Sequence, residues 1–472
     1  MIKFLRPNNN EKLWSKTIEL FNGLIWMFYL CLVIGASFVH GNYMSSQWLF
    51  FSGVFYLWFG FALLVQLFQP KISVRGLKSA YLVSVLLCLS IFWLILQISL
   101  THQSVLHDML VNSIGKQENY RPDWFEPSYL WSVEPEKTRW LALSELLMLC
   151  IFFSTIYLVN SRTRLQQLLI TLLVVGLFHS LMGIYGKFFS VIFVDMQQLD
   201  GHWSAARSYF VNRNHYGALI VLSSLSLLSY IFAKLIKEIP GRRRIYHDSS
   251  SNLKVIALAI LTIIFIFALA ASESRGASLS IVAGMILCFL VSSTSFTIKR
   301  RNMLIFILLI SILVLIVLAD GLLQRLIDSS LSIGEREQQW RITIEAILAN
   351  PLLGYGGGSY STVFQIFREE APLRNVMYAQ AHNHYLHLWL ERGFIGLCMW
   401  LLIFFFVLRQ CLVMLAKVQS RLVIGVLNAC LVIISAALIQ SLVDYNLQNL
   451  TLRVYFFVTI ALVYAAPYVR LK

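Results

Sequence analysis

Long apolar runs dominate this chain and restrict what it can fold into. Twelve segments of mostly apolar residues follow one another along the sequence, each roughly 17 to 25 residues long, and a helix of that length crosses a hydrocarbon core of about 30 Å. They lie at about 20–39, 48–68, 78–100, 139–159, 168–192, 215–236, 255–272, 277–294, 302–320, 393–413, 422–443 and 453–469. Only 13% of the residues are charged, about half the fraction typical of a soluble protein. We therefore expect an all-α polytopic membrane protein with about 12 transmembrane helices, surrounded by membrane lipids.

The basic residues divide the connections between these segments into two alternating sets. One set, which includes both termini, holds 23 of the 38 Lys and Arg residues but only four of the 23 Asp and Glu residues. The opposite side, counted with the charges at the span ends, holds 15 basic and 19 acidic residues. Because Lys and Arg accumulate on the cytoplasmic side of membrane proteins, we expect both termini in the cytoplasm. The net charge of +15 then reflects topology, and since no basic stripe alternates with stacking aromatic residues, no nucleic-acid partner is expected.

The largest outward loop is expected between the ninth and tenth spans, at residues 321–379. Within it, Glu335–Asn350 has the pattern of an amphipathic helix, which the following proline would end. Trp340 and Arg341 are expected to pack this helix against the membrane domain. The stretch Gly354–Gly358 beyond it is expected to be a flexible turn. Because no Lys-Ser/Thr follows, it is not a phosphate loop, and no nucleotide partner is expected.

These features divide the chain into four parts. Residues 1–192 would hold the first five transmembrane helices and an outward loop at 101–138. Residues 193–320 would hold helices six to nine with the arginine motifs, and residues 321–392 the large loop with a histidine motif. Residues 393–472 would hold the last three helices.

Polar residues gather just before the tenth expected span. Read as a helix, His384, His387 and Glu391 share one stripe. His382 and Asn383 would lie at the start of that helix. Polar groups at a membrane boundary are costly to keep unless they have partners or a function, so this segment is the first candidate for a site.

Neither the histidines nor the cysteines indicate a metal or another cofactor. The spacing of His382, His384 and His387 is not a dependable metal pattern, and no carboxylate–histidine motif of the metalloprotease type accompanies it. All seven cysteines lie inside apolar segments without a C-x-x-C pair. They are expected to pack as small apolar side chains.

Three further segments carry polar residues to the same, acidic side. One contains Arg207 and Arg213, the second is a turn of a few residues with Arg275, and the third, between the last two spans, contains Asp444. Each residue alone has a structural explanation. The arginines would extend from span ends to the interface or pair with outward acids, Asp444 would be a buried partner for one of them, and His382 an ordinary boundary histidine.

Together, the four segments indicate a site for a phosphorylated carrier. Two arginines on different loops suit a diphosphate, because guanidinium groups bind phosphate through paired, charge-assisted hydrogen bonds. A histidine beside them can remove a proton from a hydroxyl group near neutral pH. Since no nucleotide is expected outside the cytoplasm, the diphosphate would belong to a membrane-embedded polyprenyl carrier.

The same residues resemble those of the bacterial O-antigen ligase and O-antigen polymerase superfamily of membrane glycosyltransferases. The matching pieces, in the family's order, are Val211-Asn212-Arg213-Asn214-His215-Tyr216, Ser274-Arg275-Gly276, Trp340-Arg341 with Asn350-Pro351-Leu352-Leu353-Gly354-Tyr355-Gly356, His382-Asn383-x-Tyr385-Leu386 with Glu391-x-Gly393-x-x-Gly396, and Ser441-Leu442-Val443-Asp444-Tyr445. The first 200 residues match only as membrane spans.

The resemblance implies a GT-C-like fold and transfer of a glycan from undecaprenyl diphosphate to an acceptor hydroxyl, without metal or nucleotide sugar, at the periplasmic face of the bacterial inner membrane. It implies that Arg275 and either Arg207 or Arg213 hold the diphosphate, while His382 acts as base or positions the acceptor. Supporting roles would fall to Asn214, His215, Asn383, His384, Glu391, Arg341 and Asp444. Relatives often carry an acidic residue at the position of His384. Displacement of the diphosphate in one step would invert the anomeric centre.

Three acceptors fit this chemistry. Lipid A–core would make the protein a ligase in lipopolysaccharide or surface polysaccharide assembly, and the motif set is closest to proteins of that kind. A second lipid-linked glycan would make it an O-antigen or exopolysaccharide polymerase, and a protein Ser or Thr an O-oligosaccharyltransferase. A transporter of a lipid-linked glycan or anion is the alternative from another class. It would need polar residues along a path, whereas the middles of the expected spans are almost free of charge.

Overall fold

The structure is a computed structural model that describes residues 9–39, 45–67, 75–99, 132–191, 193, 205–235, 251–292, 329–368 and 378–470. Within these ranges the chain is helical, and one isolated bridge between Ser161 and Arg470 has β geometry. The helices are α1 (Asn9–Ala36), α2 (Ser46–Leu67), α3 (Arg75–Ser79), α4 (Tyr81–Ser99), α6 (Pro135–Leu158), α7 (Arg162–Phe189), α8 (Arg213–Ser223), α9 (Leu225–Leu235), α10 (Ser251–Ala271), α11 (Arg275–Ser292), α14 (Ser329–Ala349), α15 (Tyr360–Phe367), α16 (His384–Lys417), α17 (Arg421–Gln440), η3 (Asn446–Gln448), α18 (Leu450–Ala465) and η4 (Ala466–Tyr468).

Nine helical stretches of the described chain are long and apolar enough to cross a membrane. Two shorter apolar helices, Ile256–Ala271 and Arg275–Val291, accompany them. These helices coincide with eleven of the expected spans. The remaining expected span, 302–320, lies outside the described residues, as does most of the expected loop at 101–138. The fold is thus that of an α-helical polytopic membrane protein.

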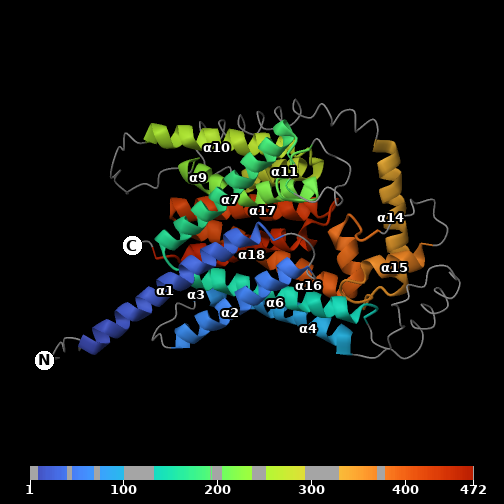
Figure 1. The fold of residues 1–472 in the computed structure, drawn as a ribbon, viewed down its shortest axis with the longest axis horizontal. Helices are drawn as coiled ribbons and strands as arrows, with labels where there is room; N and C mark the ends of the chain where they lie inside the picture. Colours follow the sequence, from blue (N-terminus) through green and yellow to red (C-terminus); the bar gives the residue numbers. More distant parts are fainter. Residues whose placement is uncertain are drawn as a thin grey trace.

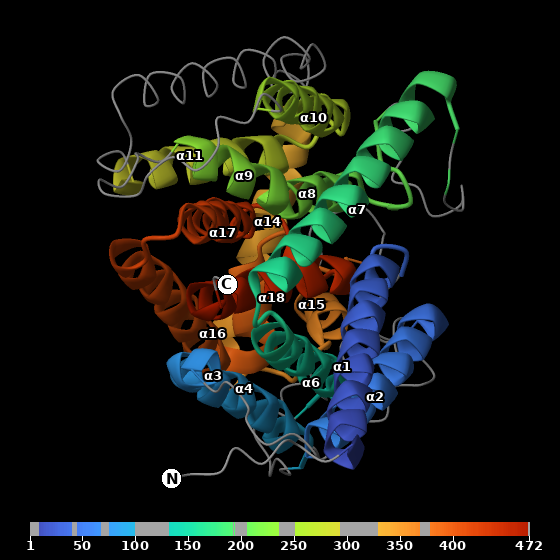
Figure 2. The same cartoon turned by 90° about the vertical axis from the view of Figure 1, so that its left-hand side faces the viewer.

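Helix α18 lies at the centre of the bundle, and every residue from Leu450 to Ala465 is buried. It packs against α6, α8 and α17. Figure 2 shows α1 and α2 on one side of this centre and α9, α10 and α11 on the other. Helix α17 approaches α11 and α9 closely at glycines. A Cβ on Gly284 of α11 would lie 2.4 Å from the Val432 carbonyl oxygen of α17, and a Cβ on Gly425 of α17 would lie 2.3 Å from the Ser229 carbonyl oxygen of α9. Small residues at such contacts are typical of helix packing in membranes.

Helices α14 and α15 lie beyond one end of the long helices (Figure 1). Helix α14 ends at Ala349, as the expected Asn350-Pro351 stop predicts, and starts at Ser329, earlier than expected. The indole Nε1 of Trp340 donates to the Ala381 carbonyl at 2.8 Å. Arg341, expected to help in this docking, instead has a side chain that is 81% exposed and pairs with Glu345 one turn along α14. Trp340 therefore docks α14 onto the histidine segment.

Helix α16 begins at His384 and is interrupted at Gly393, whose φ of 66° and ψ of −178° are not helical. The boundary suggested between residues 392 and 393 therefore falls inside one kinked helix. The polar first part of α16 lies against α14 and α15, and the apolar second part continues into the bundle.

The glycine-rich stretch Gly354–Gly358 is a packed turn and not the flexible turn that the sequence predicts. Residues 354 to 357 are buried. The N–H groups of Tyr355 and Gly356 donate to the carbonyls of Leu390 and Glu391, and a Cβ on Gly354 would lie 2.3 Å from the Gly393 nitrogen. The glycines are needed here because the turn packs directly on the α16 kink.

Candidate functional site

The histidine segment is fixed by its own backbone hydrogen bonds. Asn383 caps α16, since its Oδ1 accepts from the N–H groups of Tyr385 at 3.0 Å and Leu386 at 3.1 Å. The N–H of His384 donates to the Ser441 carbonyl at 2.8 Å, which ties the start of α16 to the end of α17. Just before the cap, His382 has a φ of 48°, a left-handed conformation unusual for a non-glycine residue. Such strain is frequent at functional sites.

The imidazole of His382 faces the segment that follows α17. Its Nδ1 lies 3.8 Å from Oδ1 of Asp444, longer than a hydrogen bond, and its ring meets the Tyr445 ring edge-on with centroids 5.1 Å apart. The Asp444 side chain is only 4% exposed, against 33% for His382. Burial raises the pKa of Asp444, but the neighbouring imidazoles of His382 and His215 and the N–H of Tyr445 lower it by more, so the pKa lies below its ordinary value. A carboxylate thus lies beside a partly exposed histidine.

Tyr445 joins this pair to the start of α8. Its hydroxyl accepts from Nδ2 of Asn212 at 3.2 Å, and its ring meets His215 edge-on at 5.0 Å. Nδ1 of His215 lies 3.3 Å from Nδ2 of Asn449. Asn212 also caps α8, because its Oδ1 accepts from the N–H of Asn214 at 2.8 Å. The structure therefore brings the expected His215, His382 and Asp444 together.

A second set of charges lies at the same end of α8. Arg213 forms an ion pair with Glu273 at 3.3 Å, and Nζ of Lys187 pairs with the other oxygen of the same carboxylate at 3.0 Å. The side chains of these three residues are 15 to 29% exposed. Neither Lys187 nor Glu273 was expected at the site. The signal for Lys187 was available, because it is a basic residue near the outward end of a long apolar span, where lysine is not favoured.

Arg275 lies two residues beyond Glu273 and is the first residue of α11. The turn that carries it packs on α8, since a Cβ on Gly217 would meet Cβ of Ser274 and Ala277, each at 3.0 Å. The same turn approaches the end of α17, where a Cβ on Gly276 would lie 3.5 Å from Val443. Arg275 is half-buried. The arginine turn, the start of α8 and the Asp444 segment are thus in contact.

Arg207 occupies a different environment within its loop. The side chain is buried, and Nη1 donates to the Val211 carbonyl at 2.9 Å. The neighbouring Ser208 contacts Nδ1 of His179 through its hydroxyl at 3.0 Å, beside the rings of Phe38, Phe178 and Tyr209.

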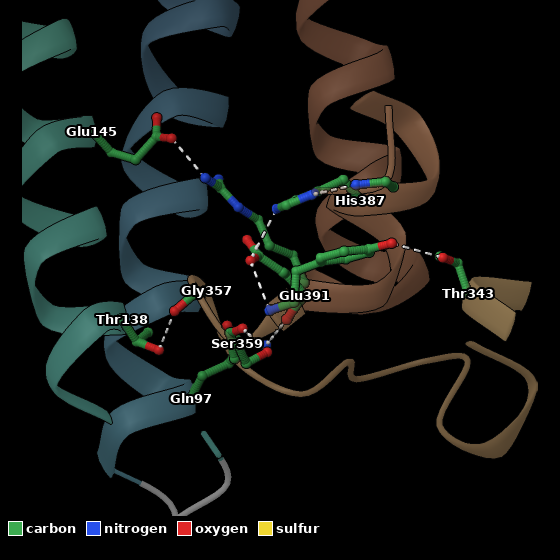
Figure 3. Close-up of polar contacts among 12 residues, drawn as sticks. Gln97, Thr138, Glu145, Thr343, Gly357, Ser359, His387 and Glu391 are labelled. Carbon is green, nitrogen blue, oxygen red and sulfur yellow. Dashed lines mark hydrogen bonds and ion pairs between the residues drawn. The ribbon is translucent and has the colours of Figure 1, made fainter. Parts of the chain in front are cut away.

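Two of the expected supporting residues belong to a separate buried network. His384, His387 and Glu391 lie on one face of α16, as the sequence spacing predicts, and Nε2 of His387 lies 3.0 Å from Oε1 of Glu391. Figure 3 shows His387 and Glu391 together with Glu145 of α6. The middles of the expected spans are almost free of charge, and Glu145, inside the span 139–159, is paired: it contacts Arg392 at 2.7 Å and also pairs with Arg453.

The fold and these clusters define the class of protein: a polytopic helical membrane protein with a charged, histidine-containing site at one end of its bundle. A family model described as O-antigen ligase matches residues 260–401, from α10 to the kinked part of α16. This match confirms the resemblance to the O-antigen ligase and polymerase superfamily over residues 260–401. The matched range contains Arg275, His382 and Glu391. No curated protein matches the chain.

Proposed function

We propose that the protein is an O-antigen ligase-like glycosyltransferase. It transfers a glycan from undecaprenyl diphosphate to an acceptor hydroxyl, with lipid A–core as the favoured acceptor, at the periplasmic face of the bacterial inner membrane. The proposed reaction is inverting and independent of metal ions, on a GT-C-like fold of about 12 spans. The observation that carries the proposal is the partly exposed His382 beside the buried Asp444, in contact with the segments that hold Arg213 and Arg275.

The proposed reaction uses His382 as the general base. Nδ1 faces Asp444, so Nε2 would accept the proton of the acceptor hydroxyl. The oxygen then forms a bond to the anomeric carbon while the bond between that carbon and the diphosphate oxygen breaks. The sugar passes through an oxocarbenium-like state, as in other glycosyl transfers. Asp444 would stabilise the imidazolium that forms, in the role that a buried aspartate has beside other catalytic histidines.

The arginines would stabilise the negative charge on the departing diphosphate. A well-placed donor at a developing anion contributes about 3 kcal/mol. Arg213 is the better candidate than Arg207, because Arg213 shares Glu273 with Lys187 near Arg275, whereas Arg207 is buried and donates to its own loop. We propose Arg213 and Arg275 as the diphosphate clamp and Lys187 as a third cation. Glu273 would release Arg213 and Lys187 when the diphosphate enters.

The proposal can be tested with purified protein in detergent, an undecaprenyl-diphosphate-linked glycan and candidate acceptors, with EDTA present. We expect glycan transfer and release of free undecaprenyl diphosphate. His382→Ala and Arg275→Ala should each lower the rate by about 10²-fold or more, within the range of a lost general base or a lost anion donor. Circular dichroism would check that both variants fold. Undiminished transfer in His382→Ala would show that His382 is not the general base.

The acceptor used in that assay decides the type of enzyme. Transfer to lipid A–core would make the protein a ligase, transfer to a second carrier-linked glycan a polymerase, and transfer to a protein hydroxyl an O-oligosaccharyltransferase. Absence of transfer to any of these, together with movement of the carrier across liposomes, would favour the transporter instead.

A further inference from the structure

A cavity of about 200 Å³ lies beside the histidine segment, between α6, α16 and α18. Its charged lining consists of Lys137, Glu145, Glu391, Arg392 and Arg453. Half-exposed or exposed residues at 137, 361, 379 and 380 also line it, so the cavity reaches the surface near α15. This cavity differs from the site around Asp444, because His382, Asp444, Arg213 and Arg275 are not among its lining residues.

The walls of the cavity are held in place by paired charges. Glu145 accepts from Arg392 and Arg453, and these arginines also donate to the hydroxyls of Ser90 and Ser144, each at 3.1 Å. On the other wall, Glu391 accepts from His387 and from the N–H of Tyr360 at 3.2 Å. The Tyr360 ring stacks on His387 with centroids 4.6 Å apart. Buried charges persist only when paired in this way, so the lining is preformed.

Three polar atoms of this lining lack a hydrogen-bond partner among the described residues: Nδ1 of His384, Nε of Arg392 and Nε1 of Trp400. Their side chains are each at most 6% exposed and all line the cavity. The guanidinium of Arg392 also lies over the Trp400 ring, 5.8 Å from its centroid. Buried polar groups are nearly always paired. Three residues that carry such atoms line one cavity, and the donors Nε of Arg392 and Nε1 of Trp400 point to a ligand that carries hydrogen-bond acceptors.

The chemistry of the lining selects among ligands. A phosphate group could pair with Lys137, Arg392 and Arg453. Because it mainly accepts hydrogen bonds, it could not serve the carboxylates of Glu145 and Glu391, which also accept. A hydrocarbon chain would leave the polar atoms unpaired. A sugar hydroxyl both donates and accepts, so it can serve the carboxylates as well as the indole and guanidinium groups. A cavity of about 150 Å³ holds benzene, and the 200 Å³ available here has room for one six-membered sugar ring.

We propose that this cavity is a subsite for one sugar residue next to the reacting bond, an inference that rests on the proposed function. His384 lines the cavity only two residues after His382, and Leu447 and Gln448 line it just beyond Asp444 and Tyr445. Two short segments therefore connect the subsite to the proposed base. The sugar residue belongs either to the donor glycan or to the acceptor, and the kinetics with each substrate distinguish the two.

The test compares two tryptophans that each have a buried indole Nε1 without a hydrogen-bond partner among the described residues. Trp400→Phe removes the Nε1 of a lining residue, and Trp58→Phe removes another buried Nε1 without a partner among the described residues, on α2 and outside the cavity lining. Loss of one hydrogen bond to a sugar should raise KM about tenfold for the donor or for the acceptor, but not for both. Trp58→Phe should leave both KM values unchanged, and the two variants should melt at similar temperatures.

A binding measurement separates this proposal from the proposed function. Free oligosaccharide, released from the carrier or from lipid A–core, would be titrated into the full-length protein in detergent. We expect binding to wild type and Trp58→Phe and about tenfold weaker binding to Trp400→Phe, even if no transfer occurs. Transfer that depends on His382 while Trp400→Phe changes neither KM would overturn the subsite and leave the glycosyltransferase proposal intact.

Discussion

At the residue scale, the buried Asp444 lies beside His382, with 3.8 Å between its Oδ1 and the Nδ1 of the imidazole. Its pKa is below the ordinary value in spite of burial, because His382 and His215 stabilise the carboxylate. We expect Asp444→Asn to lower kcat by about 10²-fold with little change in the donor KM, since an orienting carboxylate acts on the base and general-base catalysis contributes on the order of 10² to 10⁴. Steady-state kinetics of transfer measure both constants. A changed KM with an unchanged kcat would assign Asp444 to substrate binding instead.

The same lowered pKa predicts how Asp444 contributes to stability. A carboxyl group whose pKa is lower in the folded state stabilises the fold above its unfolded pKa of about 3.9, and the stabilisation is lost as the pH falls through the folded value. Below about pH 4, the melting temperature of the wild type should therefore fall more steeply than that of Asp444→Asn. Parallel curves would show that the carboxylate has no stabilising partner in the fold.

A further prediction concerns the negative charge of Glu273, which the substitution Glu273→Gln removes. Its carboxylate pairs with both Arg213 and Lys187, so it competes with any anion for these cations. Glu273→Gln should bind inorganic diphosphate several-fold more tightly, because about 1 kcal/mol of competing ion pairing corresponds to about fivefold in Kd. Isothermal titration calorimetry of wild type and variant measures this. Glu345→Gln, which loses the exposed pair with Arg341, is the matched control and should not change Kd. Weaker binding to Glu273→Gln would mean that the carboxylate positions the cations.

At the element scale, the kink of α16 joins the polar segment to the membrane span. Gly393 has a φ of 66°, and a Cβ there would lie 2.2 Å from the Leu352 carbonyl oxygen. Nε2 of Gln97 holds the same junction by donating to the carbonyls of Leu353 and Glu391. The glycine-rich turn and the kink thus form one packed joint.

We expect Gly393→Ala to destabilise the protein by about 1–3 kcal/mol, the usual cost of a residue forced into a sparsely populated conformation. Thermal unfolding in detergent would show a lower melting temperature. Gly60→Ala is the control, because Gly60 is exposed on the helix α2 with no atom within 4 Å of an added Cβ. Alanine there should be neutral or stabilising. Equal melting temperatures for the two variants would contradict the packed joint.

Features that follow from local sequence could be predicted, and those that depend on distant partners could not. The spacing of His384, His387 and Glu391 places them on one helical face, and the Asn383 cap is a local signal. In contrast, Glu145 finds its arginine partners 247 and 308 residues away. No periodicity relates such residues. The buried glycine turn was misjudged for the same reason, since its partner Gly393 lies on another element.

At the scale of the whole molecule, the two ends of helix α7 lie near different sets of charged residues. Helix α7 has 28 residues and is therefore about 40 Å long, so Arg162 and Lys187 lie at opposite ends of it. Arg470 lies beside the Arg162 end, because Ser161 and Arg470 form a bridge. Lys187 lies with Glu273 at the other end. Arg162 and Arg470, two of the residues expected in the cytoplasm, are thus at the end opposite to the proposed site.

This polarity predicts which residues a membrane-impermeant reagent reaches. Cysteine introduced by Glu345→Cys, on the site side of the bundle with a native side chain 52% exposed, should react with an impermeant maleimide in intact spheroplasts. Cysteine introduced by Arg470→Cys, an exposed position at the opposite end, should react only after the membrane is permeabilised. The wild-type chain provides the background from its own cysteines. The reverse labelling pattern would show that the protein has the opposite orientation in the membrane. The cluster of His382, Arg213 and Arg275 would then face the cytoplasm, and a periplasmic transfer reaction at that cluster would be excluded.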